Sequence, residues 1–266
     1  MRLNSLRPAR PPPLPPPVPE AEGRRPRCIA LDGPAAAGKT TVGRLLAQRL
    51  GMRWLDTGIL YRAVTAAALE AGLAPEDEAA LMGLLARRPL RVVPRSDSPL
   101  DLAVTLGGAD MDQALRDPAI DANVSAVARH LALRTALLEP QRAVAREHPV
   151  IMLGRDIGTV VLPDADLKLY LDASEEARAR RRLRECLARG EAATFAQVLA
   201  ATVARDGKDS GRAVAPLSIA PTAVVVDTDR CDMAGVVAHL LALVARWPDA
   251  LTTGGGRAAC GLPLPR

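Results

Sequence analysis

The sequence has few aromatic residues and almost no lysine. Aromatic side chains make up 2% of the 266 residues, so the core is expected to consist mainly of Leu, Val and Ala. Of the 35 cationic residues only three are Lys, and the rest are Arg. Because Ala and Pro are also abundant, the arginine content reflects a bias of the whole chain and does not by itself indicate a function.

Paired cysteines and long apolar runs are also missing. The four cysteines, Cys28, Cys186, Cys231 and Cys260, are far apart and show no C-x-x-C spacing. This argues against a disulfide framework or a zinc site and favours a reducing compartment. No apolar run approaches the roughly 18–20 residues of a membrane span, and the N-terminus has no hydrophobic signal segment. We expect a cytoplasmic protein that does not bind membranes.

Net charge is absent from the central part of the chain. Residues 1–27 contain six Arg and two Glu, and residues 249–266 contain two Arg and one Asp. The remaining residues 28–248 carry 27 cations and 27 anions, although the whole chain has a net charge of +5. A globular part without a general basic field is not expected to bind nucleic acid. Proline runs predict a disordered arm over 1–27, and three consecutive glycines predict a disordered tail over 249–266.

One stretch near the start of the central part has a specific chemical meaning. Gly33-Pro34-Ala35-Ala36-Ala37-Gly38-Lys39-Thr40 fits G-x-x-x-x-G-K-[ST] and is followed by Thr41. An apolar run over 28–31 precedes it, as in a buried strand, and apolar residues at helical spacing follow it up to Gly51. Strand, glycine-edged loop and helix together form the context in which this motif binds phosphate.

The residues of this loop suit a nucleoside triphosphate. Gly33 and Gly38 let the backbone curl closely around a polyphosphate, and the N-terminus of the following helix favours an anion. Lys39 is expected to reach the β- and γ-phosphates, and the Thr40 hydroxyl is expected to bind Mg²⁺. A strand-to-helix turn that binds nothing would not require Gly, Lys and Thr together at this spacing.

Two further segments place polar residues where strands end. Asp56, Thr57, Tyr61 and Arg62 follow a short strand, and Arg155 and Asp156 follow a predicted buried strand over 149–153. In open α/β sheets the carboxyl ends of the strands form the rim where ligands bind. Between these segments, residues 73–121 break the βα rhythm, and the alternation over 100–106 predicts a small β insertion. The polar, glycine-containing segment 205–212 suits a mobile lid.

Together these residues resemble the bacterial-type cytidylate kinases, which belong to the P-loop nucleoside monophosphate kinases. The resemblance spans about residues 28–245 and rests on GPAAAGKTT, LDTGILYR, GRDIGTVVLPDA, LDASEE and RDGKDSGRAVAPL, in that order. It implies an α/β P-loop kinase fold in residues 28–248, with a central parallel sheet flanked by helices. A monophosphate-binding part would include the β insertion at about 73–121, and a lid would lie at about 174–216. The family also implies a monomer.

The resemblance assigns roles to individual residues. Lys39 and the loop of residues 33–41 would bind ATP, and Thr40 would bind Mg²⁺. Arg62, Arg155 and Arg212 resemble the arginines that hold the acceptor's phosphate and assist transfer. Ser125, Arg134 and Asp156 resemble the residues that recognise the cytosine edge. Arg205 and Asp209 resemble groups near the acceptor ribose, and Thr57 resembles a hydroxyl residue near the acceptor.

The expected activity is transfer of the γ-phosphoryl group of ATP to CMP or dCMP, giving ADP and CDP or dCDP, in pyrimidine nucleotide metabolism. Cytosine has an N4 amine that donates hydrogen bonds and, next to it, atoms that accept them. A carboxylate can accept from the amine, and donor side chains can bind the acceptor atoms. Two other hypotheses stay open: a P-loop kinase for another small substrate such as UMP, and a nucleotide-dependent switch without transfer activity. A second phosphate site argues against the switch.

Three positions depart from the family pattern. Leu153 stands where an acid commonly precedes Gly-Arg-Asp, and Asp32 is the candidate to replace that acid near Mg²⁺. Lys208 and Ser210 stand where the family often has cations, so the lid is expected to contribute less positive charge.

Overall fold

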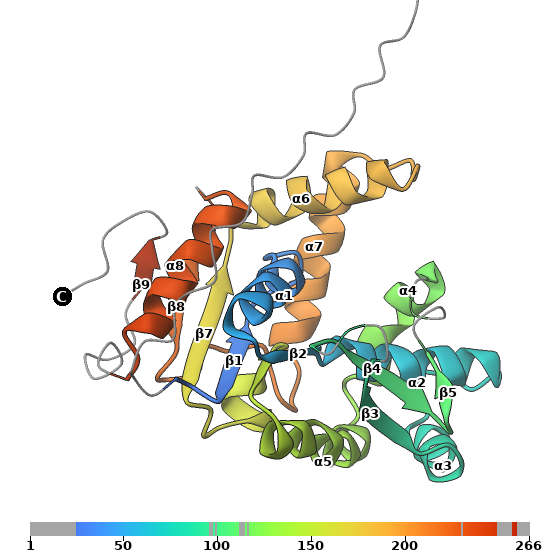
Figure 1. Cartoon of the computed structure of the whole chain (residues 1–266). Helices are drawn as coiled ribbons and strands as arrows, with labels where there is room; N and C mark the ends of the chain where they lie inside the picture. The colour runs from blue at the N-terminus through green and yellow to red at the C-terminus, as the bar shows by residue number, and fades with distance from the viewer. Residues whose placement is uncertain are drawn as a thin grey trace, which may run out of the picture.

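The structure of the chain is a computed structural model. It describes residues 25–95, 98, 100–111, 115, 117–229, 231–248 and 257–259. Figure 1 shows a central sheet with helices on both faces, a smaller sheet at the lower right and a pair of helices above. The expected α/β class is confirmed. In the described residues, no helix combines the length and apolar character that a membrane crossing requires.

The central sheet is parallel throughout, with strand order β2-β6-β1-β7-β8-β9. Its inner strands are buried on both faces, and such strands appear in a sequence as continuous apolar runs. This explains why most of them could be predicted. In chain order the strands are β1 Cys28–Asp32, β2 Arg53–Asp56, β6 Val150–Leu153, β7 Leu167–Asp172, β8 Val224–Asp227 and β9 Arg257–Ala259.

The two faces of this sheet are covered by different helices. Side chains alternate along a strand, so neighbouring residues of β1 enter different cores. Ile29 packs in the core that contains residues of α1 Lys39–Leu50 and α8 Met233–Ala245. Ala30 packs in the core that contains residues of α2 Gly58–Glu70 and α5 Leu131–Glu147. Strand β1 thus lies between both cores, and the phosphate loop starts at its carboxyl end.

The insertion contains the predicted strands and one helix that was not predicted. Strand β4 Leu102–Leu106 pairs antiparallel with both β3 Leu90–Pro94 and β5 Ala109–Asp110. Before them lies α3 Glu78–Arg87, whose first turn is capped by Asp77 accepting a 2.9 Å hydrogen bond from the Ala80 N–H. The capping aspartate and the helical spacing of the buried Leu81, Leu84 and Leu85 are the sequence features that indicate this helix.

Two helices, α4 and α5, follow the insertion. Asp117 caps α4 Pro118–Val127 by accepting from the Ala119 N–H at 2.8 Å, and Pro118 takes the first helical position as predicted. Residues 128–130 then interrupt the apolar stripe before α5 begins. Both helices contribute residues to the same core and to the cleft described below.

The segment expected to form the lid consists of two packed helices, α6 Glu175–Ala188 and α7 Phe195–Ser210. Ser174 caps α6, and Thr194 and Gln197 form the capping box that their spacing predicts. Residues 205–210, despite Gly207, belong to the last turns of α7. Residues of the expected lid therefore sit on a helix that faces the cleft.

The chain ends differ in part from the expectations. Within the predicted tail 249–266, residues 257–259 form β9, which pairs with β8 from Val225↔Arg257 to Asp227↔Ala259. A strand this short shows no period of two in the sequence, yet it satisfies backbone groups that an edge strand would leave unpaired. Most of the expected N-terminal arm, residues 1–24, lies outside the described residues.

The cysteines also need one correction. Cys28 and Cys186 have free thiols, but Cys231 is disulfide-bonded, and its partner lies outside the described residues. Spacing along the chain did not reveal this bond because folding brings distant residues together.

Candidate active site

The phosphate loop joins β1 to α1 and depends on two glycines. Gly33 has a φ of +145°, and a Cβ there would lie 2.2 Å from the Leu171 carbonyl oxygen. Gly38 has a φ of +94°, a value that L side chains rarely adopt. The backbone between them can therefore curl in a way that other residues would not allow.

Lys39 starts α1 and turns its ammonium group back into the loop. Its Nζ donates to the carbonyl oxygens of Gly33 at 2.7 Å and Pro34 at 2.6 Å. Burial lowers the pKa of Lys39 well below its ordinary value, and the nearby Arg155 lowers it further. The ammonium group of Lys39 is thus held inside the loop, close to the guanidinium group of Arg155.

Thr40 contacts a carboxylate from the next strand. Its hydroxyl donates to Asp56 Oδ2 at 2.7 Å, and Asp56 Oδ1 also accepts from the Gly58 N–H at 3.1 Å. Magnesium prefers oxygen donors and in kinases takes one or two carboxylates together with substrate phosphates. Among the described residues no cluster of three or more acids, His or Cys could hold a metal alone. The pair Thr40 and Asp56 therefore fits the ion that the loop implies.

Leu153, which replaces the acid, and Asp32, the candidate to stand in for it, each have defined contacts. Leu153 is fully buried, and a Cβ on Gly43 would meet its Cδ2 at 2.5 Å, so Leu153 fills the contact between β6 and α1. Asp32 accepts from the N–H groups of Ile157 at 2.9 Å and Gly158 at 2.8 Å. Burial raises the pKa of Asp32 to about 6. Its carboxylate thus holds the turn after Asp156, and Asp56 takes the position beside Thr40 that sequence reasoning had not assigned.

Arg155 and Arg212 meet on one buried carboxylate. Asp209 accepts from Arg155 Nε at 3.1 Å through Oδ2 and pairs with Arg212 Nη2 at 3.2 Å through Oδ1. Asp209 is 6% exposed, so these bonds fix two guanidinium groups that come from β6 and from the end of α7. Burial lowers the pKa of Arg212, although Asp209 opposes this effect. Two of the residues expected to bind phosphate thus lie together.

Arg205 extends this cluster on α7. Burial and then the nearby Arg155 lower the pKa of its guanidinium. Its Nε is buried and has no hydrogen-bond partner among the described residues. A buried donor without a partner is costly, and an anionic ligand would satisfy it.

Arg134 and Asp156 form a buried ion pair beneath this cluster. Arg134 Nη2 donates to Asp156 Oδ2, its Nη1 donates to the Ala128 carbonyl at 3.0 Å, and its guanidinium lies 5.2 Å from the centre of the Tyr61 ring. Both ionic side chains are almost fully buried, at 7% and 8% exposure. Ser125 of α4 lines the same cleft. The three residues expected to recognise a base therefore come from separate segments and lie on one cleft.

Arg62 and Thr57 occupy the part of the cleft that follows β2. Arg62 on α2 pairs with Asp121 of α4 and donates to the Leu115 carbonyl at 3.0 Å. Thr57 is buried, and its hydroxyl donates to the Leu153 carbonyl at 2.9 Å. The proton of Thr57 is thus engaged by the protein, which leaves its oxygen lone pairs for any contact with a ligand.

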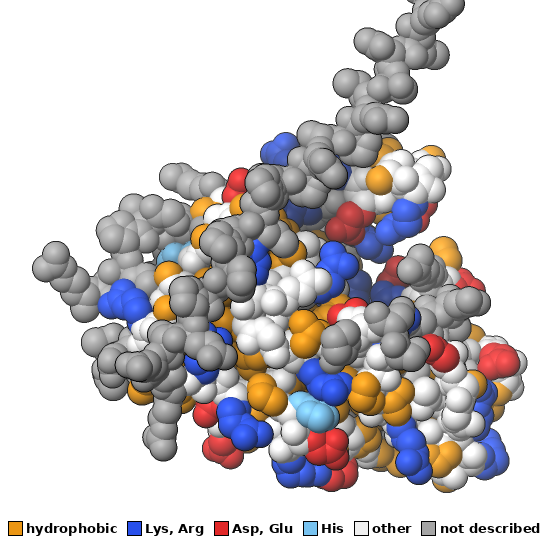
Figure 2. All heavy atoms as spheres, viewed as in Figure 1, with side chains coloured by type: hydrophobic (Ala, Val, Ile, Leu, Met, Phe, Trp, Pro, Cys, Tyr) orange, Lys and Arg blue, Asp and Glu red, His pale blue; other side chains and the backbone are white. Residues whose placement is uncertain are grey.

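Most of the residues predicted for the site line one cleft of about 1720 Å³, although Gly33 and Pro34 of the loop do not. Figure 2 shows basic and acidic side chains on both sides of the hollow between the α6–α7 pair and the part that carries α4. A volume above the roughly 300–1,000 Å³ of a single small-ligand pocket is large enough for two ligands. The cleft is lined by the loop residues from Ala35 to Thr41 and by Thr57, Arg62, Ser125, Arg134, Arg155, Asp156, Arg205, Asp209 and Arg212.

One arginine of α6 lies close to the phosphate loop. Arg178 is 3% exposed, pairs with Asp206 of α7 at 2.5 Å and donates to the Ala35 carbonyl at 3.2 Å. The five arginines of this helix are spread around it, a spacing that favours mostly solvated side chains with one or two that reach phosphate. Sequence spacing could not single out Arg178 because its burial depends on how α6 packs against α7.

Comparisons with known proteins identify the family of this chain. A family model described as cytidylate kinase matches residues 29–246. The cytidylate kinase of Geobacter sulfurreducens is 44% identical over 224 residues, or 84% of this chain and 95% of that protein. That of Corynebacterium efficiens is 45% identical over 216 residues, or 81% of this chain and 93% of its own. A solved gluconokinase from Sinorhizobium meliloti is 16% identical, with a TM-score of 0.43 over 86% of this chain and 98% of that one. From the family match and these two relatives, the chain belongs to the cytidylate kinase family.

Proposed function

We propose that this chain transfers the γ-phosphoryl group of ATP to CMP or dCMP, producing ADP and CDP or dCDP for pyrimidine nucleotide metabolism. The observation that carries the proposal is the pairing of two cationic sites in one cleft. Lys39 and its loop form one site, and Arg155 and Arg212 on Asp209 form the other. A protein that only switched with bound nucleotide would not need the second site.

The donor site is the loop with Lys39 and Thr40. A triphosphate would be surrounded by loop N–H groups, and Lys39 would exchange the Gly33 and Pro34 carbonyls for the β- and γ-phosphates. Thr40 and Asp56 would hold Mg²⁺, and the ion would supply positive charge that neutralises the phosphates.

The acceptor's phosphate would bind among Arg62, Arg155 and Arg212. Asp209 orients Arg155 and Arg212 before any ligand arrives, so little reorganisation is needed when charge develops. The unsatisfied Nε of Arg205 adds a donor in the same region. Arginine suits this task because its planar guanidinium can hold two phosphate oxygens at once.

The buried pair of Arg134 and Asp156 supports cytosine as the base. A carboxylate has two oxygens, so Asp156 can keep Arg134 and also accept from the exocyclic N4 amine. Ser125 and Arg134 can donate to the acceptor atoms of the same base edge. Uracil carries an oxygen where cytosine has the amine, so Asp156 would face a second acceptor and would lose that bond.

The transfer itself needs positioning and charge neutralisation more than a strong base. Lys39 would contact the reacting group from the donor site, and Arg155 and Arg212 would contact it from the acceptor site. The α6–α7 pair carries residues that line the cleft and would exclude water when closed. We infer that a monomer is sufficient because every residue named in this proposal comes from one chain.

A coupled assay of ADP release with ATP and Mg²⁺ tests the proposal with CMP, dCMP, UMP and AMP as parallel acceptors. We expect strong turnover with CMP and dCMP and little with the others. Strong turnover with UMP would keep the kinase but contradict the roles of Ser125, Arg134 and Asp156. No turnover with any acceptor would favour another small-substrate kinase or the switch.

A further inference from the structure

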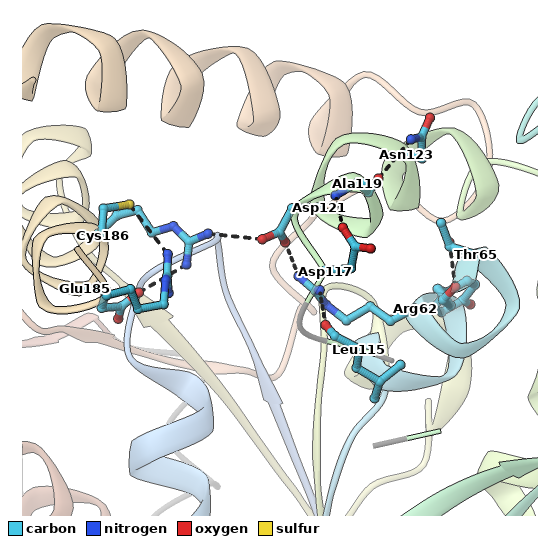
Figure 3. Close-up of polar contacts among 12 residues, drawn as sticks. Arg62, Thr65, Leu115, Asp117, Ala119, Asp121, Asn123, Glu185 and Cys186 are labelled. Atoms are coloured by element: carbon cyan, nitrogen blue, oxygen red, sulfur yellow. Dashed lines mark hydrogen bonds and ion pairs between the residues drawn. The ribbon is translucent and has the colours of Figure 1, made fainter. Parts of the chain in front are cut away.

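Asp121 joins two parts of the cleft that belong to different elements. It lies in the first turn of α4, where its Oδ1 pairs with Arg62 Nη2 of α2. Its Oδ2 accepts from Arg182 Nη2 of α6 at 3.3 Å. Figure 3 shows Asp121 between Arg62 on one side and the part of α6 near Glu185 and Cys186 on the other. One carboxylate thus connects the acceptor part with the lid helices.

Both terminal nitrogens of Arg62 are engaged in this arrangement. Nη2 donates to Asp121, and Nη1 donates to the Leu115 carbonyl at 3.0 Å. A guanidinium has five N–H donors, so Arg62 keeps its Nε–H and one N–H on each terminal nitrogen for a phosphate. A phosphate that binds there comes close to the two protein oxygens that these nitrogens already contact. Leu115 contributes a neutral carbonyl, whereas Asp121 contributes a full negative charge. The charged contact with Asp121 is the one that competes directly with an anionic ligand.

Asp121 lies close to two other cations besides Arg62, namely Arg182 and Arg205. Burial raises the pKa of its carboxyl, but Arg62, Arg182 and Arg205 lower it, and the net shift is downward. The group is thus an anion at neutral pH. Side-chain exposures of 24% for Arg62, 36% for Asp121 and 35% for Arg182 leave these pairs partly solvated. Partly solvated pairs are weak enough to exchange partners readily.

We propose that Asp121 is a positioning residue that holds Arg62 in the absence of acceptor, yields it to the acceptor's phosphate, and then keeps Arg182 of the lid as its partner. The proposal rests on the proposed function, because it takes Arg62 as a ligand of the acceptor's phosphate. Arg62 stays oriented toward the cleft in the empty protein, and loss of one partner strengthens the contact of Asp121 with α6. Acceptor binding and the position of the lid are thereby coupled through one side chain.

If Asp121 competes with phosphate for Arg62, removal of its charge should raise the affinity for CMP. A purely structural role of Asp121 would not have this effect. Asp121→Asn keeps the size of the side chain but removes the charge that competes with phosphate. CMP should therefore bind about three- to five-fold more tightly, the range for a partly exposed charged contact. Cytidine has the same base and ribose but no phosphate, so its affinity should not change. Asp121→Ser, which also removes the carboxylate, should shift CMP affinity in the same direction.

The experiment is isothermal titration of CMP and cytidine into the full chain and its Asp121→Asn, Arg62→Ala and doubly substituted variants. Asp117→Asn is the matched control, because Asp117 lies at the same end of α4 but contacts the Ala119 N–H and not Arg62. Asparagine caps helices as well as aspartate, so this control removes an equal charge without weakening the helix. In the Arg62→Ala background, Asp121→Asn should leave CMP affinity unchanged.

The outcomes separate this inference from the proposed function. Tighter CMP binding by Asp121→Asn, with cytidine and the Asp117→Asn control unchanged, would support it. Unchanged or weaker CMP binding, or an equal change for cytidine, would overturn it while leaving the kinase assignment intact. Failure of the unsubstituted protein to bind CMP would overturn both.

Discussion

The hydroxyl of Thr40 donates to Oδ2 of Asp56 over 2.7 Å, which ties the start of α1 to the end of β2. The two residues are 16 positions apart in sequence. A carboxylate that accepts the hydroxyl proton leaves the oxygen lone pairs of Thr40 directed elsewhere, as a metal ligand requires. Asp56 would thus orient the ligand even where it does not itself contact the ion.

Asp56→Asn is expected to weaken Mg²⁺ binding in the nucleotide complex by about ten-fold or more, because partners that orient a metal ligand commonly contribute this much. Titration of Mg²⁺ at fixed ATP should show a higher requirement, and calorimetry should show weaker Mg²⁺-dependent binding of ADP. When Thr40→Val is combined with Asp56→Asn, Mg²⁺ binding should weaken little further, because both substitutions disrupt the same hydrogen-bonded pair. An unaltered Mg²⁺ requirement would exclude Asp56 from the site.

Lys39→Ala is expected to reduce phosphoryl transfer by about 1000-fold or more, because a fixed cation at the transferred group is lost. The fold should survive, since the partners of Nζ are two loop carbonyls. Activity and thermal unfolding measured together check this. Arg44→Ala, on the exposed face of the same helix, is the matched control and should keep its activity. Retained turnover by Lys39→Ala would contradict the role of the loop.

Much of this fold could be predicted where the signal is local. The loop motif, the buried runs of β1 and β6, and the caps at Asp117, Ser174 and Thr194 each depend on a few neighbouring residues. Lys39 and Thr40 lie in the loop, and Arg155 and Asp156 directly follow β6. Other assigned residues lie outside these segments: Thr57 and Arg62 follow β2, and Arg134 lies on α5. Because parallel strands bring their carboxyl ends to one edge, such segments converge without further information.

Other features depend on contacts between distant segments. The buried position of Leu153 follows from the close approach of α1 at Gly43, and the position of Asp56 follows from the pairing of β2 with β6. The burial of Arg178 requires α7 to pack on α6. No spacing in the sequence reports these distances, so the contact of Asp56 with Thr40 could not be predicted, and a role of Asp32 near Mg²⁺ stays a prediction.

Asp156→Ala is expected to lower kcat/KM for CMP by about 100-fold, because a buried charged contact to the base is lost. The Kd of ATP should change less than about two-fold. The same change leaves the Arg134 guanidinium buried without its carboxylate, which costs about 3–5 kcal/mol of unfolding free energy. Asp156→Asn keeps one oxygen for Arg134 and should be more stable than Asp156→Ala. Unchanged CMP kinetics in Asp156→Ala would contradict base recognition by this residue.

Stability should depend on pH through Asp32, whose folded-state pKa is raised by burial from 3.8 to about 6. Between these values the folded chain binds more protons at this site than the unfolded chain. The contribution of Asp32 to the unfolding free energy is therefore fully present below about pH 4 and is lost as pH rises through about 6, by up to about 3 kcal/mol. Asp32→Asn cannot titrate, so urea unfolding at pH 4, 5, 6 and 7.5 isolates the effect as the difference between the two proteins. We expect the unsubstituted protein to lose stability relative to Asp32→Asn across this range. A difference that stays constant, or one of opposite sign, would mean that the hydrogen bonds from the Ile157 and Gly158 N–H groups compensate for the burial of the carboxylate.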